Sequence, residues 1–207
     1  DFIWDSYSED YYEREMVDVL QSRDGLDMII ENSEVKNCEA IFKDNLHPNW
    51  CELYHQVVKL GVSSVFECGT GCGHHLINIK KLCPSIEING CDYSKKQIDL
   101  GYKHFNLREY DFSDRLFVKD FTEDLDTGDI QPHEFVFTQA VTMHLAYEKA
   151  KKFIRNMGSV SSKYVFLIEN ITAHDYPSLF EEVLPEFERI HDSKYLDTGF
   201  LLKRKNV

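Results

Sequence analysis

A glycine-rich segment near the middle of the chain has the residue types needed to bind a small molecule. An apolar run that starts at Val65 leads into Glu67, glycines follow at positions 69, 71 and 73, and a helical pattern begins directly after them. Glycines let the backbone turn tightly and let a ligand pack against bare main chain. A nicotinamide dinucleotide would suit such a turn. The alternation Gly-x-Gly-x-Gly and the acidic residue two positions before the first glycine favour another ligand.

Polar residues also follow three later strand-like runs. Asp92 closes the second run, 19 residues after the last glycine of the loop, and the pair Asp120-Phe121 closes the third. The fourth run passes through Gln139 and leads to His144. Neutral imidazole can accept a proton near pH 7, so His144 is a candidate general base. A structural histidine that bonds to the backbone fits the same pattern.

The elements that must position these residues alternate from residue 62 onward. Strand-like runs cover 62–69, 87–93, 115–121, 133–141, 163–170 and 198–205, and helical runs cover 74–84, 95–107 and 146–158. A further helix is expected within 178–190, interrupted near Pro185. Such alternation predicts an α/β fold with a mainly parallel sheet and helices on both faces. In such folds ligands bind beyond the carboxyl ends of the strands, which is where the polar residues above are found.

The first 60 residues indicate a different organisation. Apolar residues from Met16 to Ile30 recur close to helical spacing, with an interruption at Asp24-Gly25, and predict two short helices. A longer helix is expected over 49–61, where Gly61 suits the C-terminal cap. We therefore expect residues 1–60 to form a helical cap or lid on a core of residues 61–207, within one structural domain overall.

The order and spacing of these motifs, over about residues 50–205, resemble class I S-adenosylmethionine-dependent methyltransferases. In that family Glu-x-Gly-x-Gly-x-Gly follows the first strand, an acidic residue ends the second, an Asp ends the third, and a His often follows the fourth. The resemblance implies a Rossmann-like, seven-stranded, mainly parallel sheet with an antiparallel last strand and a helical N-terminal extension. It also implies S-adenosyl-L-methionine as cofactor and S-adenosyl-L-homocysteine as product.

The resemblance also implies roles for individual residues. Asp92 would bind both ribose hydroxyls, Asp120 the adenine amino group, and Phe121 the adenine ring through its backbone amide. Thr70 and Gln139 would contact the methionine carboxylate and amine. The expected cofactor-binding residues are Glu67, Gly69, Thr70, Gly71, Asp92, Tyr93, Asp120, Phe121 and Gln139.

Several of these residues also have a purely structural interpretation. Asp92 suits a helix N-terminus, because Ser94 can cap the following helix. Asp120 precedes other loop acids, and Glu67 fits an exposed strand end. Tyr93, expected to pack on the adenine, fits an ordinary surface position as well.

For the reaction, the sequence offers His144 and Glu169 as candidate catalytic residues. His144 would take a proton from a hydroxyl acceptor as the methyl group is transferred. Glu169, followed by Asn170, ends the fifth strand-like run at the same edge of the predicted sheet. Metal-dependent members of the family have an Asp ligand where this chain has Thr138-Gln139, so we expect a reaction without a metal.

A second resemblance concerns the acceptor. The segments 47–54 and 137–144 look like those of sugar and glycan methyltransferases, and are similar to the methyltransferase domain that ends a multidomain glycosyltransferase of chloroviruses. This implies O-methylation of a sugar hydroxyl, with rhamnose of a viral glycan as expected acceptor and glycosyltransferase domains upstream. Two alternatives remain open. One is a methyltransferase of a small amine or protein side chain, with Glu169 as the key group, and the other is a non-catalytic module that binds the cofactor.

Composition limits the partners and the location. The chain carries 23 Lys and Arg against 36 Asp and Glu, a net charge of −13, so a nucleic acid is not an expected partner. No run approaches the ~20 apolar residues of a membrane span, and the acidic N-terminus does not resemble a signal peptide. Six cysteines without a Cys-x2-Cys pair fit reduced thiols. We expect a cytoplasmic protein, in the host cytoplasm if viral, and, because the first residue is not Met, a domain of a longer polypeptide.

Overall fold

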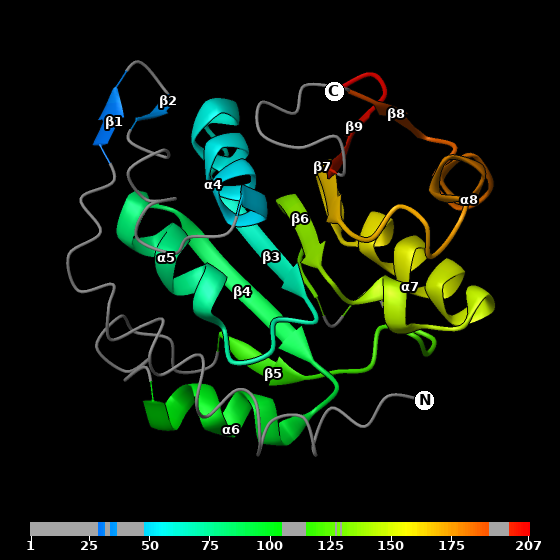
Figure 1. Ribbon diagram of the computed structural model, residues 1–207, viewed down its shortest axis with the longest axis horizontal. Helices are drawn as coiled ribbons and strands as arrows, with labels where there is room; N and C mark the ends of the chain where they lie inside the picture. Colours follow the sequence, from blue (N-terminus) through cyan, green and yellow to red (C-terminus); the bar gives the residue numbers. More distant parts are fainter. Residues whose placement is uncertain are drawn as a thin grey trace.

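The computed structural model describes residues 29–31, 34–36, 48–104, 115–126, 128, 130–190 and 199–207. The first of the two short N-terminal helices expected from the sequence, and the last three residues of the helix expected over 95–107, lie outside these ranges. Within them, strands form one mixed sheet of seven and one small hairpin, and helices flank the larger sheet on both faces (Figure 1).

The strands of the large sheet run in the order β5-β4-β3-β6-β7-β9-β8. They are β3 (Ser64–Cys68), β4 (Glu87–Asp92), β5 (Leu116–Val118), β6 (His133–Gln139), β7 (Ser161–Ile168), β8 (Phe187–Arg189) and β9 (Gly199–Arg204). The pairs from β5 to β7 are parallel, whereas β9 is antiparallel to both of its neighbours. The predicted seven-stranded, mainly parallel sheet with an antiparallel last strand is confirmed. Because the strand order reverses between β3 and β6, their carboxyl ends are the expected place for a ligand.

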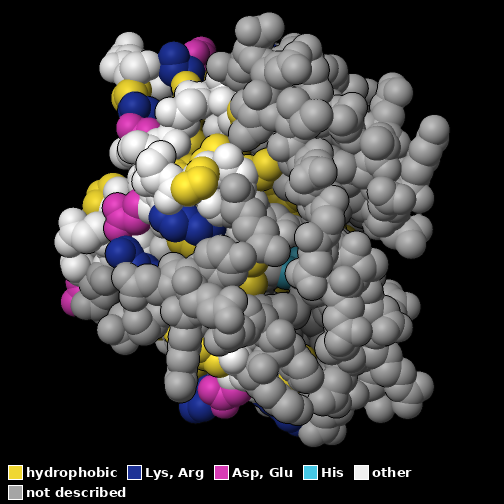
Figure 2. Space-filling view, turned by 90° about the vertical axis from the view of Figure 1, so that its left-hand side faces the viewer, with side chains coloured by type: hydrophobic (Ala, Val, Ile, Leu, Met, Phe, Trp, Pro, Cys, Tyr) yellow, Lys and Arg dark blue, Asp and Glu magenta, His cyan; other side chains and the backbone are white. Residues whose placement is uncertain are grey.

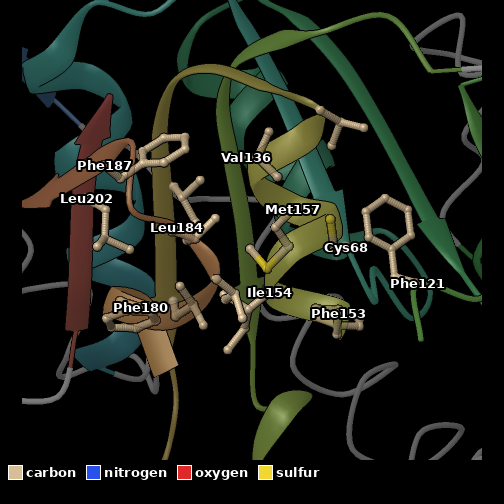
Figure 3. Packing of buried hydrophobic residues seen from close by; sticks show 14 of the residues in the cluster. Cys68, Phe121, Val136, Phe153, Ile154, Met157, Phe180, Leu184, Phe187 and Leu202 are labelled. Carbon is tan, nitrogen blue, oxygen red and sulfur yellow. The ribbon is translucent and has the colours of Figure 1, made fainter. Parts of the chain in front are cut away.

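Two hydrophobic cores lie on opposite faces of this sheet. The helices that cover them are α4 (Pro48–Leu60), α5 (His74–Leu82), α6 (Lys95–His104), α7 (Tyr147–Ser159) and α8 (Tyr176–Val183). Val65 of β3 points into the core under α4, α5 and α6, and the next residue, Phe66, points into the core under α7 and α8. Figure 3 shows this second core, where Ile154 and Met157 of α7 pack close to Val136 of the sheet. A sheet covered on both faces requires this alternation with a period of two.

The seventh strand, β8, lies where the sequence pattern favours a helix. Helix α8 ends at Val183, and Pro185 follows, which cannot continue a helix. Phe187 pairs with Arg204 of β9 in antiparallel register, and its side chain is buried in the second core. The residues before the proline form the expected helix, but those after it form an edge strand because β9 offers a partner.

The hairpin replaces part of an expected N-terminal helix. β1 (Ile29–Glu31) pairs with β2 (Glu34–Lys36) in antiparallel register. The prediction of a helix that runs through Ile29 and Ile30 is therefore wrong. β-branched residues on both sides of a two-residue connection favour paired strands over a helix. The other residues of the expected cap before α4 lie outside the described ranges.

Helix α4 is present where the sequence predicts a helix over 49–61. Gly61 follows it with a φ angle of +60°, and its N–H donates to the carbonyl oxygen of Val58 at 3.2 Å. A left-handed residue after the last helical turn satisfies a carbonyl that the helix itself leaves open. The predicted C-terminal cap is confirmed.

The helices, the surface and the cysteines of the described residues are typical of a globular protein. Among the described helices, none combines the length and the hydrophobicity of a membrane span. Figure 2 shows one face of the molecule, on whose described part acidic and basic side chains lie among hydrophobic ones. The five described cysteines are free thiols, and all but Cys83 are buried. Burial raises the pKa of the Cys68 and Cys91 thiols, which makes them unreactive core residues.

Candidate active site

The glycine-rich loop joins β3 to α5 and turns sharply because its glycines adopt left-handed conformations. The φ angles of Gly69, Gly71 and Gly73 are +74°, +55° and +81°. The N–H groups of Gly69 and Thr70 both donate to the carbonyl oxygen of Cys91, at 2.8 and 2.9 Å. The loop is thereby fixed to the end of the neighbouring strand β4 before it enters α5.

The same glycines let the loop approach its neighbours closely. A Cβ atom at Gly69 would lie 2.5 Å from Cγ2 of Val141, in the turn after β6. A Cβ atom at Gly73 would lie 2.9 Å from Cδ1 of Leu116 in β5. Both distances are shorter than van der Waals contact. The leucine side chain at Gly73 is flexible, but the β-branched Val141 is not, so a larger residue at position 69 would push the loop and the turn apart.

Asp92 connects the glycine loop to the start of the next helix. Its Oδ2 accepts the N–H of Gly71 at 2.9 Å, and its Oδ1 accepts the N–H of Ser94 at 2.8 Å. Ser94 in turn accepts the N–H of Gln97 at 3.3 Å through its hydroxyl oxygen, as a helix cap does. The carboxylate is nearly buried, and a carboxylate oxygen can accept more than one donor. The structural and the ligand-binding interpretations of Asp92 are therefore compatible.

Glu67, in the strand that leads into the glycine loop, stabilises the loop through Thr70. The side chain is 2% exposed, and its Oε2 accepts the hydroxyl of Thr70 at 2.7 Å. Burial is the main cause that raises the pKa of Glu67 well above its usual range, and the charge of Asp92 acts in the same direction. The alternative interpretation of an exposed strand end is excluded, because Glu67 lies at the centre of the sheet, where the helices cover both faces.

Asp120 and Phe121, just beyond β5, have different surroundings. Oδ1 of Asp120 accepts both the backbone N–H and the hydroxyl of Thr122, each at 2.8 Å. The ring of Phe121 stacks on Phe66, with centroids 5.8 Å apart, and belongs to the second core (Figure 3). Any contact of Phe121 with a ligand therefore involves its backbone, as the resemblance implies.

The ends of β4 and β5 lie side by side at the same edge of the sheet. The N–H of Lys119 donates to the carbonyl oxygen of Asp92 at 2.9 Å. Tyr93, the residue after Asp92, is 49% exposed. A large aromatic ring that stays exposed beside a buried carboxylate is suited to stack on a ligand.

Strand β6 ends in two buried polar atoms that have no hydrogen-bond partner in the described structure. They are Oγ1 of Thr138 and Oε1 of Gln139. Buried polar atoms are nearly always paired, and these two lie at the strand end where ligands bind in such sheets. The amide oxygen of Gln139 accepts hydrogen bonds, which suits an ammonium group such as the predicted methionine amine.

His144 lies directly beyond β6, in the short 3-10 turn η4 (Thr142–His144). Its backbone N–H donates to the carbonyl oxygen of Val141 at 3.1 Å, and its side chain is exposed. Desolvation of the covered part of the ring lowers the pKa of His144. The imidazole is therefore neutral at pH 7 and able to accept a proton.

Glu169, which follows β7, holds the backbone of the same turn. Its Oε1 accepts the N–H groups of Val141 and Thr142 at 3.0 and 3.1 Å, and its Oε2 accepts that of Met143 at 3.2 Å. Burial raises the pKa of Glu169 to about 7, although the three hydrogen bonds act to lower it. Both oxygens are engaged by the turn, so the geometry gives Glu169 a supporting position.

Two further residues support the site without any signal in the sequence. Asn156 of α7 donates to the carbonyl oxygens of Phe121 and Glu123, both at 2.8 Å, and so holds the segment after β5. The hydroxyl of Tyr176 in α8 lies 3.0 Å from the hydroxyl of Thr142. Each is distant in the sequence from the residues that it holds, so no local pattern marks it.

The predicted site residues thus form two connected groups. Hydrogen bonds link the first group, which consists of Glu67, Thr70, Gly71 and Asp92. The second group links Glu169 to the turn that carries His144. Val141, packed against Gly69, joins the two. In the described ranges, no group of three or more His, Cys, Asp and Glu side chains is arranged to hold a metal ion.

Comparison with known proteins identifies the fold. No protein-family model matches the sequence, and no curated protein does. Magnesium protoporphyrin IX methyltransferase from Synechocystis PCC 6803, with bound S-adenosylmethionine, is similar in structure, with a TM-score of 0.61 over 99% of both chains at 13% identity. The chain has the class I methyltransferase fold.

Two further methyltransferases share this fold. The N-methyltransferase NodS from Bradyrhizobium japonicum WM9, in complex with S-adenosylhomocysteine, has a TM-score of 0.54 over 79% of this chain and 91% of its own, at 11% identity. The plantazolicin methyltransferase, also in complex with S-adenosylhomocysteine, has a TM-score of 0.55 over 76% and 82%, at 10% identity. At such identities the similarity concerns the fold alone.

Proposed function

We propose that this chain is an S-adenosylmethionine-dependent methyltransferase. The observation that carries the proposal is the left-handed glycine loop at the end of β3, bonded to Asp92 where the strand order reverses. Left-handed glycines expose backbone to a ligand, and a carboxylate at the end of the next strand suits the two hydroxyls of a ribose. The methyltransferase fold agrees with this assignment.

The chain's own residues fit the parts of that cofactor. Asp92 accepts from the ribose hydroxyls, Tyr93 packs on the adenine, and Asp120 accepts from its amino group. The unpaired Oε1 of Gln139 accepts from the methionine ammonium, and Thr70 contacts its carboxylate. When bound, the cofactor supplies a methyl group activated by the sulfonium.

We infer that the acceptor is a sugar hydroxyl, with rhamnose of a glycan as the first candidate. The exposed, neutral imidazole of His144 supports this proposal, because a hydroxyl becomes a good nucleophile only as it loses its proton. The protein would hold the hydroxyl oxygen about 3–3.5 Å from the methyl carbon, and His144 would take the proton. No step of this reaction uses a metal ion.

The proposal also includes the compartment of the protein and the domains that accompany it. Buried free thiols at Cys68 and Cys91 support a reducing compartment such as the cytoplasm. A glycan acceptor would suit a domain fused to glycosyltransferase domains upstream.

Calorimetric titration with S-adenosylhomocysteine tests the cofactor assignment. We expect micromolar binding by the wild-type chain and roughly 10- to 100-fold weaker binding by Asp92→Ala, which loses hydrogen bonds to a charged group. The matched control is Asp99→Ala on α6, because Asp99 is exposed and pairs with Lys95. Absence of heat and of a thermal shift in the wild-type chain would overturn the proposal.

A methyl-transfer assay then separates the possible acceptors. Labelled cofactor is incubated with rhamnosides, small amines and peptides, and the methylated atom is identified by mass spectrometry. Transfer to an amine would replace the sugar assignment by the alternative, in which Glu169 has the larger role. Tight binding without transfer to any acceptor would favour a non-catalytic module.

A further inference from the structure

We propose that Glu169, His174 and Tyr176 form a clamp that positions the turn carrying His144, and that Glu169 is a positioning residue of the reaction. This inference rests on the proposed function for its catalytic consequence. The turn, residues 140–144, follows β6, and the three clamp residues come from the chain after β7 and from α8.

The turn requires support because its backbone is strained. Ala140 has a φ angle of +54°, in the left-handed region that residues with a Cβ atom seldom adopt. Its N–H still donates to the carbonyl oxygen of Ile168 at 3.0 Å, as the last contact of the sheet. Such conformations persist only where the surrounding contacts enforce them.

Glu169 supplies the first of these contacts. One carboxylate accepts three consecutive backbone N–H groups, those of Val141, Thr142 and Met143. The side chain is only 4% exposed. Its oxygens are therefore committed to the turn, and the residue acts on the reaction through His144.

His174 and Tyr176 complete the clamp at Thr142. Nε2 of His174 lies 2.9 Å from the carbonyl oxygen of Thr142, a contact in which the ring must donate. The hydroxyl of Tyr176 lies 3.0 Å from the Thr142 hydroxyl. With Glu169 on its N–H, Thr142 is held at its amide, its carbonyl and its side chain, and His144 lies two residues further on.

The far side of the turn faces the glycine loop. The side chain of Val141 occupies the space that a Cβ atom at Gly69 would need. The clamp therefore holds the turn next to the loop that is proposed to bind the cofactor. In the proposed reaction, the clamp would thereby set the position of the His144 imidazole relative to the cofactor loop.

The variant Glu169→Gln tests the clamp with little change of shape. One carboxylate oxygen becomes an amide N–H₂, which faces a backbone donor and cannot accept from it. The matched control is Glu134→Gln at the opposite end of β6. Glu134 also accepts a backbone N–H, that of Ser63 at 2.8 Å, and contacts Lys163 at 2.6 Å, but it lies far from the turn.

Two readouts need no acceptor. We expect the amide protons of residues 141–143 to exchange roughly tenfold or more faster in Glu169→Gln than in the wild-type chain or the control. We also expect the pKa of His144, followed by NMR, to rise toward its usual value of about 6.5, because release of the turn exposes the covered part of the ring. Loss of a negative charge alone would move this pKa in the opposite direction.

A third readout concerns the reaction. With an acceptor found in the transfer assay, kcat of Glu169→Gln should fall roughly 10- to 100-fold, while KM for the cofactor and the Kd of S-adenosylhomocysteine change less than about threefold. Tyr176→Phe, which removes only a hydroxyl, should show the same effects at smaller size. It provides the test if Glu169→Gln does not fold.

The outcomes separate this inference from the proposed function. Unchanged amide exchange, or unchanged His144 titration and turnover, in Glu169→Gln would overturn the clamp even when the wild-type chain binds S-adenosylhomocysteine. A wild-type chain that does not bind S-adenosylhomocysteine would overturn the proposed function. The exchange and titration readouts would still decide whether the clamp holds the turn.

Discussion

Buried carboxylates at one edge of the sheet differ in their partners, and the partners determine what each can do. Glu67 accepts a side-chain hydroxyl inside the glycine loop, whereas Glu169 accepts three backbone amides of another loop. Asp92 accepts one amide at each oxygen, beside the glycine loop and the exposed Tyr93. Of the three, Asp92 is the residue suited to recognise ribose, and the other two are suited to hold loops in place.

At the residue scale, we predict that His144→Ala loses most turnover of a hydroxyl acceptor. A general base contributes about 10²- to 10⁴-fold to kcat, and the Kd of S-adenosylhomocysteine should stay within about twofold of the wild-type value. Because His144 is exposed, the fold should be unaffected. The measurement is the initial rate of methyl transfer, together with calorimetry.

Glu148→Gln is the control for this prediction, because Glu148 is an exposed residue near the start of α7. Its rate should equal that of the wild-type chain. A His144→Ala variant with full activity would remove His144 from the mechanism.

The glycine loop and the turn after β6 are two elements that depend on each other. The loop passes close to the turn only because Gly69 has no side chain, and the turn keeps its place because Glu169 holds it. Neither element packs in this way alone. A side chain added at position 69 of the loop should therefore change the turn measurably.

At the element scale, we predict that Gly69→Ala abolishes cofactor binding whereas Gly61→Ala does not. Both glycines have positive φ angles, +74° and +60°, so both variants pay a strain of about 1–2 kcal/mol. A Cβ atom at Gly69 would also overlap with the side chain of Val141, whereas nothing lies within 4 Å of a Cβ atom at Gly61. The overlap should add about 1–3 kcal/mol to the loss of stability.

Urea unfolding measures the stability of Gly69→Ala and Gly61→Ala, and calorimetry with S-adenosylhomocysteine measures their binding. Equal losses of stability with retained binding in both variants would show that the loop tolerates a methyl group at position 69. The amide exchange of residues 141–143 should increase in Gly69→Ala and remain unchanged in Gly61→Ala.

At the scale of the whole molecule, helices cover both faces of the sheet. A carboxylate at the end of a central strand is therefore shielded from solvent. Glu67 and Glu169 are both nearly inaccessible to solvent, at 2% and 4% exposure. Burial raises the pKa of both groups. The stability of the protein should therefore depend on pH through groups that are far from its surface.

We predict that Glu169 makes the protein less stable as the pH rises from about 4.5 to about 7. In this window the folded state retains the proton, since the pKa of Glu169 is raised to about 7, and the unfolded state has released it. The free energy of unfolding then falls by about 1.4 kcal/mol per pH unit, and by about 2–3 kcal/mol between pH 5 and pH 8. Above pH 7 the effect is constant.

Urea unfolding of the wild-type chain and of Glu169→Gln at pH 5, 6, 7 and 8 checks this sign. The advantage of the wild-type chain over the variant should be largest at pH 5 and smallest at pH 8. Glu134→Gln is the control, because a lysine partner lowers the pKa of Glu134 and its titration lies below this window. An advantage that grows with pH would contradict the raised pKa.

The sequence by itself determined the alternation of strands and helices, the glycine loop and the position of Asp92 after it. These features are local: a strand covered on both faces needs an apolar run, and a tight turn needs glycine. The same locality explains why Gln139 could be placed in the last part of the fourth strand-like run, although the strand ends at Gln139 itself, two residues earlier than expected. The hairpin at Ile29 was missed because short apolar runs suit both a helix and a strand.

Only the tertiary structure decided β8, the contacts of Glu169 and the packing of Val141 against Gly69. Each depends on a partner from a distant part of the chain. Glu169 and Thr142 are 27 residues apart, and Asn156 lies 35 residues from the carbonyl oxygen that it holds at Phe121. A sequence pattern records which residues can be buried or can donate, but the partner of a buried carboxylate is fixed only when the sheet brings two loops to the same edge.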